Sequence, residues 1–319
     1  MEERRRKFWG WGFEGDGLSP EEQRLIDSAW AKQLGVDHFD VTPTPSADEI
    51  TLRAPRVQPP PSLRDICATD HYERLRHSYG QSFPDSVRAF QRDFSNPPDL
   101  VAFPRTEQDV SDVFDWCGSL GAAAIPYGGG SSVVGGVEPP CPADGPYTGS
   151  VTIDLKHLNR VIEIDPVSEA ARIQGGTYGP QIEEQLKPSG LTLRHFPQSF
   201  EFSTLGGWIA TRSGGHFATL HTHIDDLVES LRVVTPAGVV ETRRLPGSGA
   251  GPSPDRTFIG SEGILGIVTE AWMRVRKRPA FRSSASVRFS DFFKAVDAVR
   301  IISQSGLYPA NCRLLDAQE

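Results

Sequence analysis

A run of closely spaced glycines between two strand-like segments limits most strongly what this chain can fold into. The run reads Tyr127-Gly128-Gly129-Gly130-Ser131-Ser132-Val133-Val134-Gly135-Gly136. Successive backbone N–H groups in such a turn form a concave site for an anion, and glycine permits the positive φ angles that the turn requires. Residues 128–132 therefore predict a cradle for a phosphate or pyrophosphate, with an ordinary surface loop between two strands as the alternative.

Two common kinds of phosphate loop do not fit this run. A P-loop has a Lys followed by Ser or Thr after its glycines, and this loop contains no Lys. A Rossmann turn opens directly into a helix, whereas this loop runs into Glu138-Pro139-Pro140-Cys141-Pro142, which cannot lie inside a helix. Asp154 lies near the spacing of a ribose-binding acid, but that interpretation fails without the helix. What remains is a cradle between strands that binds through backbone amides.

The composition favours a mixed fold that is rich in loops. The 31 Gly and 26 Pro make up nearly a fifth of the 319 residues, which argues against a helical bundle or a coiled coil. Hydrophobic residues at 38% are enough for a core, and the length suits about two domains. A net charge of −8 disfavours a nucleic-acid partner, because such proteins are usually basic.

The cysteines and the apolar pattern bear on the cellular compartment. Cys67, Cys117, Cys141 and Cys312 form no close pair, so we expect free thiols in a reducing compartment and neither a zinc site nor a redox motif. No apolar run approaches the roughly 20 residues that span a bilayer, and residues 1–7 are charged rather than apolar, unlike a signal peptide. We expect a cytoplasmic protein.

Apolar spacing and capping residues predict the order of the elements. The expected helices cover 20–34, 106–120, 179–187 and 291–304, with weaker helical patterns at 72–79 and 86–93. The expected strands cover 101–103, 122–125, 151–155, 161–165, 170–174, 231–236, 239–242, 267–276, 284–289 and 312–315. Residues 41–62 are dense in Pro and polar residues, which predicts a linker or an extended arm.

Several motifs along the chain resemble one family. The glycine loop follows a strand and precedes Val151-Thr152-Ile153-Asp154-Leu155. Later segments read QSFEFSTLGGWIATRSGG (198–215) and GSEGILGIVTE (260–270), and the ends of the chain contain WGWG (9–12) and RLLD (313–316). This set resembles the PCMH-type FAD-binding domain of the vanillyl-alcohol-oxidase superfamily, and within it the alkyldihydroxyacetonephosphate synthase family.

The resemblance implies an α+β architecture in three parts. Residues 1–95 would form an N-terminal helical and extended arm, 96–278 a two-part FAD-binding domain, and 279–319 the beginning of a substrate-binding α/β cap. Family members continue well beyond this point and place catalytic Tyr and His residues there. We therefore expect the chain to be C-terminally incomplete and without activity alone. Phe292, Phe293, Val296, Val299 and Ile302 would then have little to pack against.

The resemblance assigns FAD contacts to four segments. Residues 126–132 would hold the pyrophosphate, 198–204 and 211–214 the flavin side, and 262–268 the region near the adenine-ribose and the ring. The cofactor-binding residues are Pro126, Tyr127, Gly128, Gly129, Gly130, Ser131, Ser132, Gln198, Ser199, Phe200, Glu201, Phe202, Ser203, Thr204, Thr211, Arg212, Ser213, Gly214, Glu262, Gly263, Ile264, Leu265, Gly266, Ile267 and Val268. Members with covalently attached flavin carry a His in or near the loop, whereas this loop has Ser131 and Ser132, so we expect non-covalent FAD.

Two arginines have alternative interpretations. Arg212 is either a support behind the FAD contacts or a solvated surface cation. Arg313 matches an active-site Arg of the family, where a guanidinium would hold a phosphate or carboxylate with two hydrogen bonds. A salt bridge from Arg313 to a neighbour such as Asp316 is the structural alternative.

The histidines and the N-terminal arm also have two interpretations each. His216, His221 and His223 lie near Asp225 and Asp226 and are chemically able to bind zinc. We expect no metal, because loop histidines are more often exposed or hydrogen-bonded and the family uses no metal there. The basic and aromatic residues 4–13 either touch an anionic membrane peripherally or pack over the domain, which their short length favours.

The function that the resemblance implies is an exchange of the acyl group of acyl-dihydroxyacetone phosphate for a long-chain alcohol, in ether-lipid synthesis and without net redox. An FAD-dependent dehydrogenase of 2-hydroxy acids of the D-lactate or glycolate type is one alternative, since fold does not fix function. A flavin-binding fragment without activity is another. The expected substrate is a small or lipid-like molecule, and a homodimer stays open.

Overall fold

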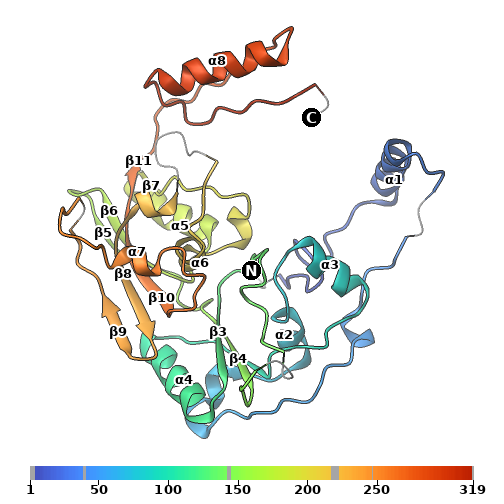
Figure 1. Cartoon of the computed structure of the whole chain (residues 1–319), viewed down its shortest axis with the longest axis vertical. Helices are drawn as coiled ribbons and strands as arrows, with labels where there is room; N and C mark the ends of the chain where they lie inside the picture. The colour runs from blue at the N-terminus through green and yellow to red at the C-terminus, as the bar shows by residue number, and fades with distance from the viewer. Residues whose placement is uncertain (1–3, 39–40, 142–144, 217–222, 246, 318–319) are drawn as a thin grey trace. The chain divides into compact units, whose positions relative to one another are not determined.

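The computed structural model describes residues 4–38, 41–141, 145–216, 223–245 and 247–317. The chain forms two compact units. Unit 1 comprises Met1–Val101, Leu120–Ile125 and Ser132–Thr152, and unit 2 comprises Ala102–Ser119, Pro126–Ser131 and Ile153–Glu319. Both units contain helices and strands (Figure 1), which agrees with the α+β class expected from the sequence.

Unit 1 contains a four-stranded sheet with the order β1-β2-β4-β3. Its strands are β1 (Cys67–Ala68), β2 (Leu100–Ala102), β3 (Ala123–Tyr127) and β4 (Ser150–Asp154), and the last residues of β2, β3 and β4 belong to unit 2. Its helices are α1 (Pro20–Leu34), α2 (His71–Arg76) and α3 (Phe83–Phe90), with 3-10 turns η1 (Ala47–Glu49) and η2 (Pro61–Ile66). The helix predicted at 20–34 is confirmed as α1, which begins with a capping box formed by Ser19 and Glu22.

The N-terminal arm packs against α2 and α3. Phe8 is buried in a cluster with Tyr72, Leu75 and Phe94, and its ring meets those of Tyr72 and Phe94 edge to face. Such aromatic pairs add about 1 kcal/mol each beyond the area that they bury. The packed interpretation of residues 4–13 therefore agrees with the structure at Phe8.

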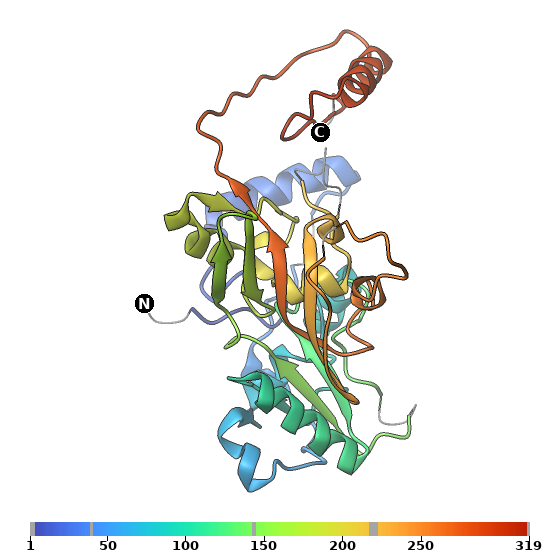
Figure 2. The ribbon, with the colours of Figure 1, turned by 90° about the vertical axis from the view of Figure 1, so that its left-hand side faces the viewer.

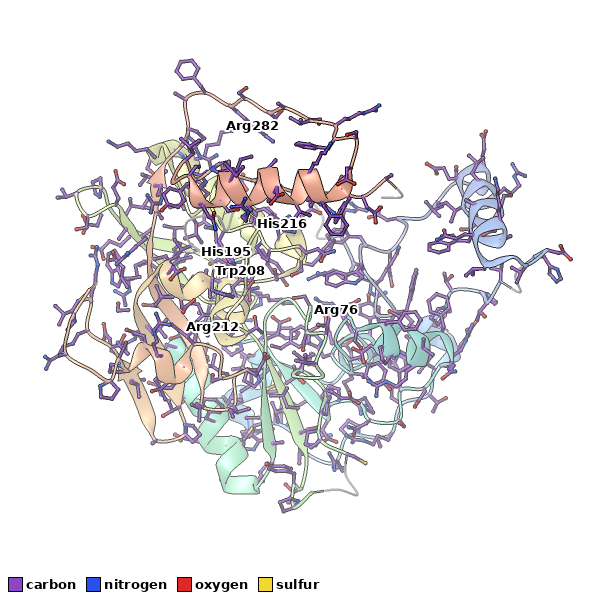
Figure 3. The ribbon with its side chains drawn as sticks, turned by 45° about the horizontal axis from the view of Figure 1, so that its top comes forward. Arg76, His195, Trp208, Arg212, His216 and Arg282 are labelled. Atoms are coloured by element: carbon purple, nitrogen blue, oxygen red, sulfur yellow. The ribbon has the colours of Figure 1, made fainter. Side chains whose placement is uncertain are left out.

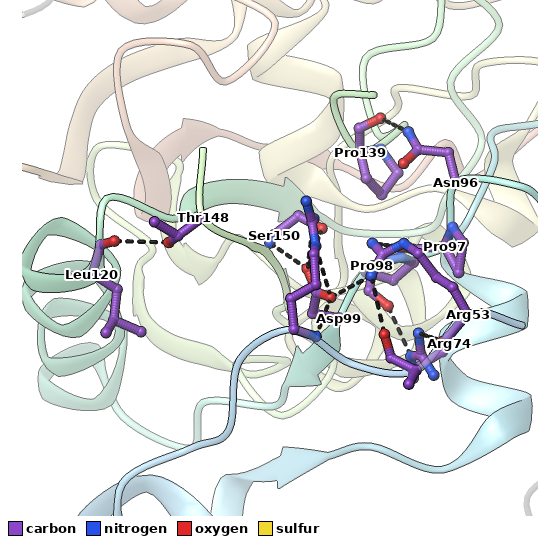
Figure 4. A network of polar contacts seen from close by, with 12 residues as sticks. Arg53, Arg74, Asn96, Pro97, Pro98, Asp99, Leu120, Pro139, Thr148 and Ser150 are labelled. Carbon is purple, nitrogen blue, oxygen red and sulfur yellow. Dashed lines mark hydrogen bonds and ion pairs between the residues drawn. The ribbon is translucent and has the colours of Figure 1, made fainter. Parts of the chain in front are cut away.

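A buried carboxylate fixes part of the extended segment 41–62. Figure 4 shows Asp99 at the centre of a polar network. The side chain of Asp99 is fully buried and forms ion pairs with Arg53 and with Arg56, whose Nη2 lies 2.8 Å from the carboxylate. The carboxylate also accepts a hydrogen bond from the N–H of Ser150 at 2.7 Å. Burial alone would raise the pKa of this carboxyl, but the hydrogen bonds from Arg56, Arg53 and Ser150 outweigh burial and hold the pKa well below its usual range.

Unit 2 is built on a five-stranded antiparallel sheet with the order β5-β6-β10-β8-β9. Its strands are β5 (Val161–Asp165), β6 (Ala170–Gln174), β8 (Val228–Thr235), β9 (Gly238–Glu241) and β10 (Ile267–Arg274), and β7 (Leu191–Thr192) pairs with β11 (Arg276–Lys277). Its helices are α4 (Glu107–Leu120, ending in unit 1), α5 (Gly179–Leu186), α6 (Leu205–Ala210), α7 (Asp255–Phe258) and α8 (Phe292–Gln304), with 3-10 turns η3 (Lys187–Ser189), η4 (Phe200–Phe202) and η5 (Ile224–Asp226).

Helices α5 and α6 pack against one face of this sheet, as Figure 2 shows from the side. Ile182 of α5 and Trp208 of α6 join Ile173, Leu231 and Met273 from the strands in one core. The strand predicted at 267–276 is present as β10, and its side chains alternate from Thr269 onward: Thr269, Ala271 and Met273 are buried, and Glu270, Trp272 and Arg274 are half-buried. Ile267 and Val268 are both buried. Burying one large apolar side chain stabilises the fold by about 2 kcal/mol.

Some expectations about the elements are wrong. Residues 284–289 and 312–315 form no strand, since no partner strand among the described residues pairs with them. The helix α6 was not expected from the sequence. Predicted helices at 106–120 and 291–304 are confirmed as α4 and α8. In α8 the apolar side chains of Phe292, Phe293, Val296 and Ile302 are between 38% and 74% exposed, which agrees with the expectation that they have little to pack against.

No helix in the described part of the chain is both long and apolar enough to cross a membrane.

Candidate functional site

The four segments assigned to FAD meet around α6 in unit 2. The glycine loop contacts η4 and Thr204, which precedes α6. The backbone N–H of Glu262 donates to the carbonyl of Ala210 at 2.8 Å, and that of Gly260 donates to Ile209 at 3.1 Å. A Cβ on Gly263 would lie 3.1 Å from Cγ of Pro126. The structure therefore brings together segments that are up to about 140 residues apart in the sequence.

The glycines of the loop allow two backbones to approach closely. A Cβ on Gly128 would overlap the Thr204 side chain, and a Cβ on Gly129 would overlap the Phe202 carbonyl and lie 2.7 Å from its carbon. Gly130 has φ +69°, which favours glycine for conformational reasons as well. Gly129 therefore has a packing role, because the space that its Cβ would enter holds the carbonyl of Phe202.

The loop retains hydrogen-bond donors that suit an anion. The backbone N–H groups of Gly130 and Ser131 donate no hydrogen bond within the described part of the chain. Consecutive amides next to a residue with positive φ form the concave donor pair that binds a phosphate oxygen. The residues present therefore fit the pyrophosphate of FAD.

Ser203 and α6 connect two of the assigned segments. Thr204 caps α6 by accepting the N–H of Gly207, and Nε1 of Trp208 donates to Oγ of Ser203 at 2.7 Å. Gly206 lies against the backbone of Gly175, to which its N–H donates at 2.7 Å. Because Trp208 is only 2% exposed, segment 198–204 is fixed to the core of unit 2 through this indole.

The segment after α7 exposes apolar side chains beside polar backbone. Ile264 is 83% exposed and Leu265 is 41% exposed. Glu262 has φ +54°, and partial burial of its carboxyl raises the pKa. Exposed apolar side chains that lie next to each other provide a surface on which a binding partner can pack.

Arg212 pairs with a buried carboxylate. Its Nη2 lies 3.1 Å from Oδ2 of Asp225, which also binds Arg256. Burial alone would raise the pKa of Asp225, but the hydrogen bonds and charges of Arg212 and Arg256 lower it below its ordinary value. Arg212 is thus half-exposed yet anchored, which favours the support interpretation over a solvated cation.

His195 is a buried residue of this site that the sequence analysis missed. Figure 3 shows it beside Trp208, and the two ring centroids lie 5.1 Å apart. Its Nε2 lies 3.3 Å from Oγ of Ser213, within segment 211–214. Burial, with a smaller effect of His223, lowers the pKa of His195 to about 4. The feature of the sequence that could have pointed to His195 is its position three residues before the assigned FAD segment that begins at Gln198.

Two of the three histidines considered as metal ligands lie in described parts of the chain. The N–H of His216 donates to the carbonyl of Phe196, and His223 pairs with Gly214 as an isolated bridge. His221 lies outside the described residues. Within the described ranges no group of three or more potential metal ligands is present.

Arg313 lies on an exposed segment after α8. No hydrogen bond or ion pair in the described part of the chain connects it to the four segments or to Asp316. Its role at an active site stays a prediction.

Comparison with known proteins gives an independent result. Residues 98–243 match the model of a family described as an FAD binding domain. An alkyldihydroxyacetonephosphate synthase of Dictyostelium discoideum is 36% identical over 302 residues, which cover 95% of this chain and 48% of that protein. A mitochondrial D-lactate dehydrogenase (cytochrome) of Arabidopsis thaliana is 33% identical and matches 80% of this chain and 42% of that protein.

A solved structure confirms the fold. A structure titled alkyldihydroxyacetonephosphate synthase superposes with a TM-score of 0.81 and 32% identity, covering 96% of this chain and 59% of that one. The chain spans about half the length of the curated relatives that it matches.

Proposed function

We propose that this chain, which carries a PCMH-type FAD-binding domain and belongs among the FAD-linked oxidases, binds FAD without a covalent bond. The observation that carries the proposal is the glycine loop, in which the N–H groups of Gly130 and Ser131 donate to nothing in the described part of the chain. Ser131 and Ser132 stand where covalent attachment would require a His.

Each segment has a distinct task in this proposal. Amides of 128–132 bind the pyrophosphate, because they supply donors without a bulky side chain. Hydroxyls and amides of 198–204 and 211–214 orient the flavin, while the apolar side chains of Ile264 and Leu265 exclude water from it. When bound, FAD supplies a ring system that can exchange electrons with a substrate.

Acid precipitation tests the mode of attachment. We expect all flavin colour to move to the supernatant when the FAD-loaded chain is denatured. Flavin retained on the precipitated protein would contradict non-covalent binding, and a chain that takes up no FAD from solution would contradict the whole proposal.

For the activity of the whole protein, we propose alkyl exchange on acyl-dihydroxyacetone phosphate. The similarity to alkyldihydroxyacetonephosphate synthases supports it, because it extends over nearly the whole chain, whereas the similarity to the D-lactate dehydrogenase covers a smaller share. That second similarity favours oxidation of a 2-hydroxy acid as the alternative function. Alkyl exchange without flavin bleaching supports the first function, and bleaching by D-lactate or glycolate supports the second.

A further inference from the structure

Residues before the FAD-binding domain contact the glycine loop in unit 1. The backbone N–H of Gln81 donates to the carbonyl oxygen of Ser132 at 2.7 Å. Gly80 lies so close that an added Cβ would overlap this oxygen and lie 3.0 Å from the carbonyl carbon. The backbone at 80–81 therefore rests directly on the peptide group of Ser132.

Ser132 in turn organises the second half of the loop. Its Oγ accepts the backbone N–H of Gly136 at 3.1 Å and that of Val134 at 3.4 Å. A serine hydroxyl that accepts two amides folds the following residues back over itself. Fixing the position of Ser132 therefore fixes the path of residues 132–136.

A forked ion pair holds the far end of the same stretch. Arg88 of α3 donates from Nη1 to Glu138 at 2.7 Å and from Nη2 at 2.9 Å. Its guanidinium also binds Asp85 and stacks 4.0 Å from the centre of the Tyr79 ring. Two parallel hydrogen bonds from one planar group restrict both distance and orientation, so α3 sets the place where the loop ends.

We propose that the segment 80–88, which precedes the residues matched by the FAD-domain family, positions the glycine loop for the cofactor. Gly80 and Gln81 hold Ser132, and Arg88 holds Glu138, so that the donors of the loop are set before FAD arrives. Gly80 and Arg88 are positioning residues, because they act through Ser132 and Glu138. The inference rests on the proposed binding of FAD.

The chain contains a matched control for Arg88. Arg92 lies four residues further along and pairs with Glu49 at 3.1 Å, away from the loop but also within unit 1. The two arginines are similarly exposed, with side-chain values of 31% and 29%. A general loss of stability in this region should follow from either substitution, whereas an effect on the loop should follow only from loss of Arg88.

The experiment is a double-mutant cycle read out by FAD affinity. Arg88→Gln, Glu138→Gln and the double variant are titrated with FAD as intact chains, beside Arg92→Gln and wild type. We expect each single variant at 88 or 138 to bind FAD about tenfold more weakly and the double variant to be no worse than either, because coupled residues share one interaction. Gly80→Ala should weaken binding similarly, whereas Arg92→Gln should retain the wild-type affinity.

Amide hydrogen exchange of the FAD-free chain gives a second readout that does not need cofactor. Amides of residues 132–138 should exchange faster in Arg88→Gln and Glu138→Gln, and at the wild-type rate in Arg92→Gln. Unchanged exchange, or FAD affinity that falls equally in Arg92→Gln, overturns the positioning role alone. A wild-type chain that binds no FAD overturns the proposed function instead.

Discussion

Asp99 lies in an environment very different from that of an exposed carboxylate. Its carboxylate is fully buried between Arg53 and Arg56, which come from the extended segment 41–62, and the N–H of Ser150 in β4. Three donors from distant positions are thus satisfied by one negative charge. A buried network of this kind is costly when a member is removed, because the remaining charges lose their partner.

We expect Asp99→Asn to lower the free energy of unfolding by about 3–5 kcal/mol, the usual cost of breaking a buried ion pair from one side. Urea denaturation at neutral pH measures this change. The control is Glu49→Gln, which removes a partner of Arg92 that is 52% exposed and should cost less than about 1 kcal/mol. Similar losses in the two variants would show that Asp99 acts as an ordinary surface charge.

His195 makes stability depend on pH in a defined direction. Its pKa is about 4 in the folded chain, below the ordinary histidine value of 6.5. As pH falls below 6.5, the unfolded chain takes up this proton while the folded chain does not, so stability is lost progressively until the pH reaches the folded pKa. Above 6.5 the imidazole is neutral in both states and makes no such difference.

Between pH 7 and pH 5 this difference lowers the free energy of unfolding by about 2 kcal/mol. His195→Gln removes the titrating group, so the variant should lose about 2 kcal/mol less than wild type over the same interval. Denaturation curves at the two pH values give the comparison, in which the carboxyl groups common to both proteins cancel. Parallel losses would mean that His195 titrates normally in the folded chain.

At the scale of single elements, local pattern decided what the sequence could predict. The alternation in β10 and the apolar face of α4 are carried by the residues of those elements alone, and both predictions are confirmed. Helix α6 was missed because Gly206 and Gly207 disfavour a helix; it forms because Thr204 caps it and Trp208 is buried. Residues 284–289 form no strand, because a strand must pair with another strand. The spacing of apolar residues does not show whether such a partner is present.

The close approach of Gly129 to Phe202 supports a prediction about the glycine loop. In Gly129→Ala the methyl group would collide with the Phe202 carbonyl and separate the loop from η4. We expect FAD affinity to fall by about tenfold or more and the FAD-free chain to lose about 1–3 kcal/mol of stability, as for other overpacked sites. Isothermal titration with FAD and urea denaturation measure the two effects.

Gly118 provides the contrast for this substitution. It lies on the exposed side of α4, where an added Cβ meets nothing within 4 Å. Gly118→Ala should raise stability by about 0.5–1 kcal/mol, because alanine favours a helix, and should leave FAD affinity unchanged. A Gly129→Ala chain that resembles Gly118→Ala in both measurements would refute the close approach at η4.

At the scale of the whole molecule, the order of the motifs indicated the FAD-binding domain, but not how its parts support one another. The four segments were assignable because their motifs match, in order, those of the family that the sequence resembles. The contact of Arg88 with Glu138 spans 50 residues and leaves no pattern in the sequence. The same holds for His195 and Ser213, whose side chains meet although they are 18 residues apart in the sequence.

Arg278 is held to unit 2 by hydrogen bonds, whereas the residues that follow it are exposed. Its backbone N–H donates to the carbonyl of Gly190 at 2.8 Å, Nε donates to Leu191 at 3.0 Å, and Nη2 binds Glu183 at 2.7 Å. Residues 279–290 form no helix or strand and are exposed, with Phe281 at 94%. An extended, exposed backbone without hydrogen bonds is what a protease requires.

Limited trypsin digestion of the FAD-loaded chain should therefore cut first after Arg282 or Arg288, and not after Arg276 or Lys277, which lie in β11. The bond between Arg278 and Pro279 is not a trypsin site, because trypsin does not cleave before proline. The large product would retain all four assigned segments, since the last of them ends at Val268, and it should keep its flavin through gel filtration. Mass spectrometry identifies the first cut. Early cleavage inside β6 or β10, after Arg172 or Arg274, would show that the sheet of unit 2 opens more readily than the segment after Arg278, and release of flavin with the C-terminal fragment would show that residues beyond 282 hold the cofactor.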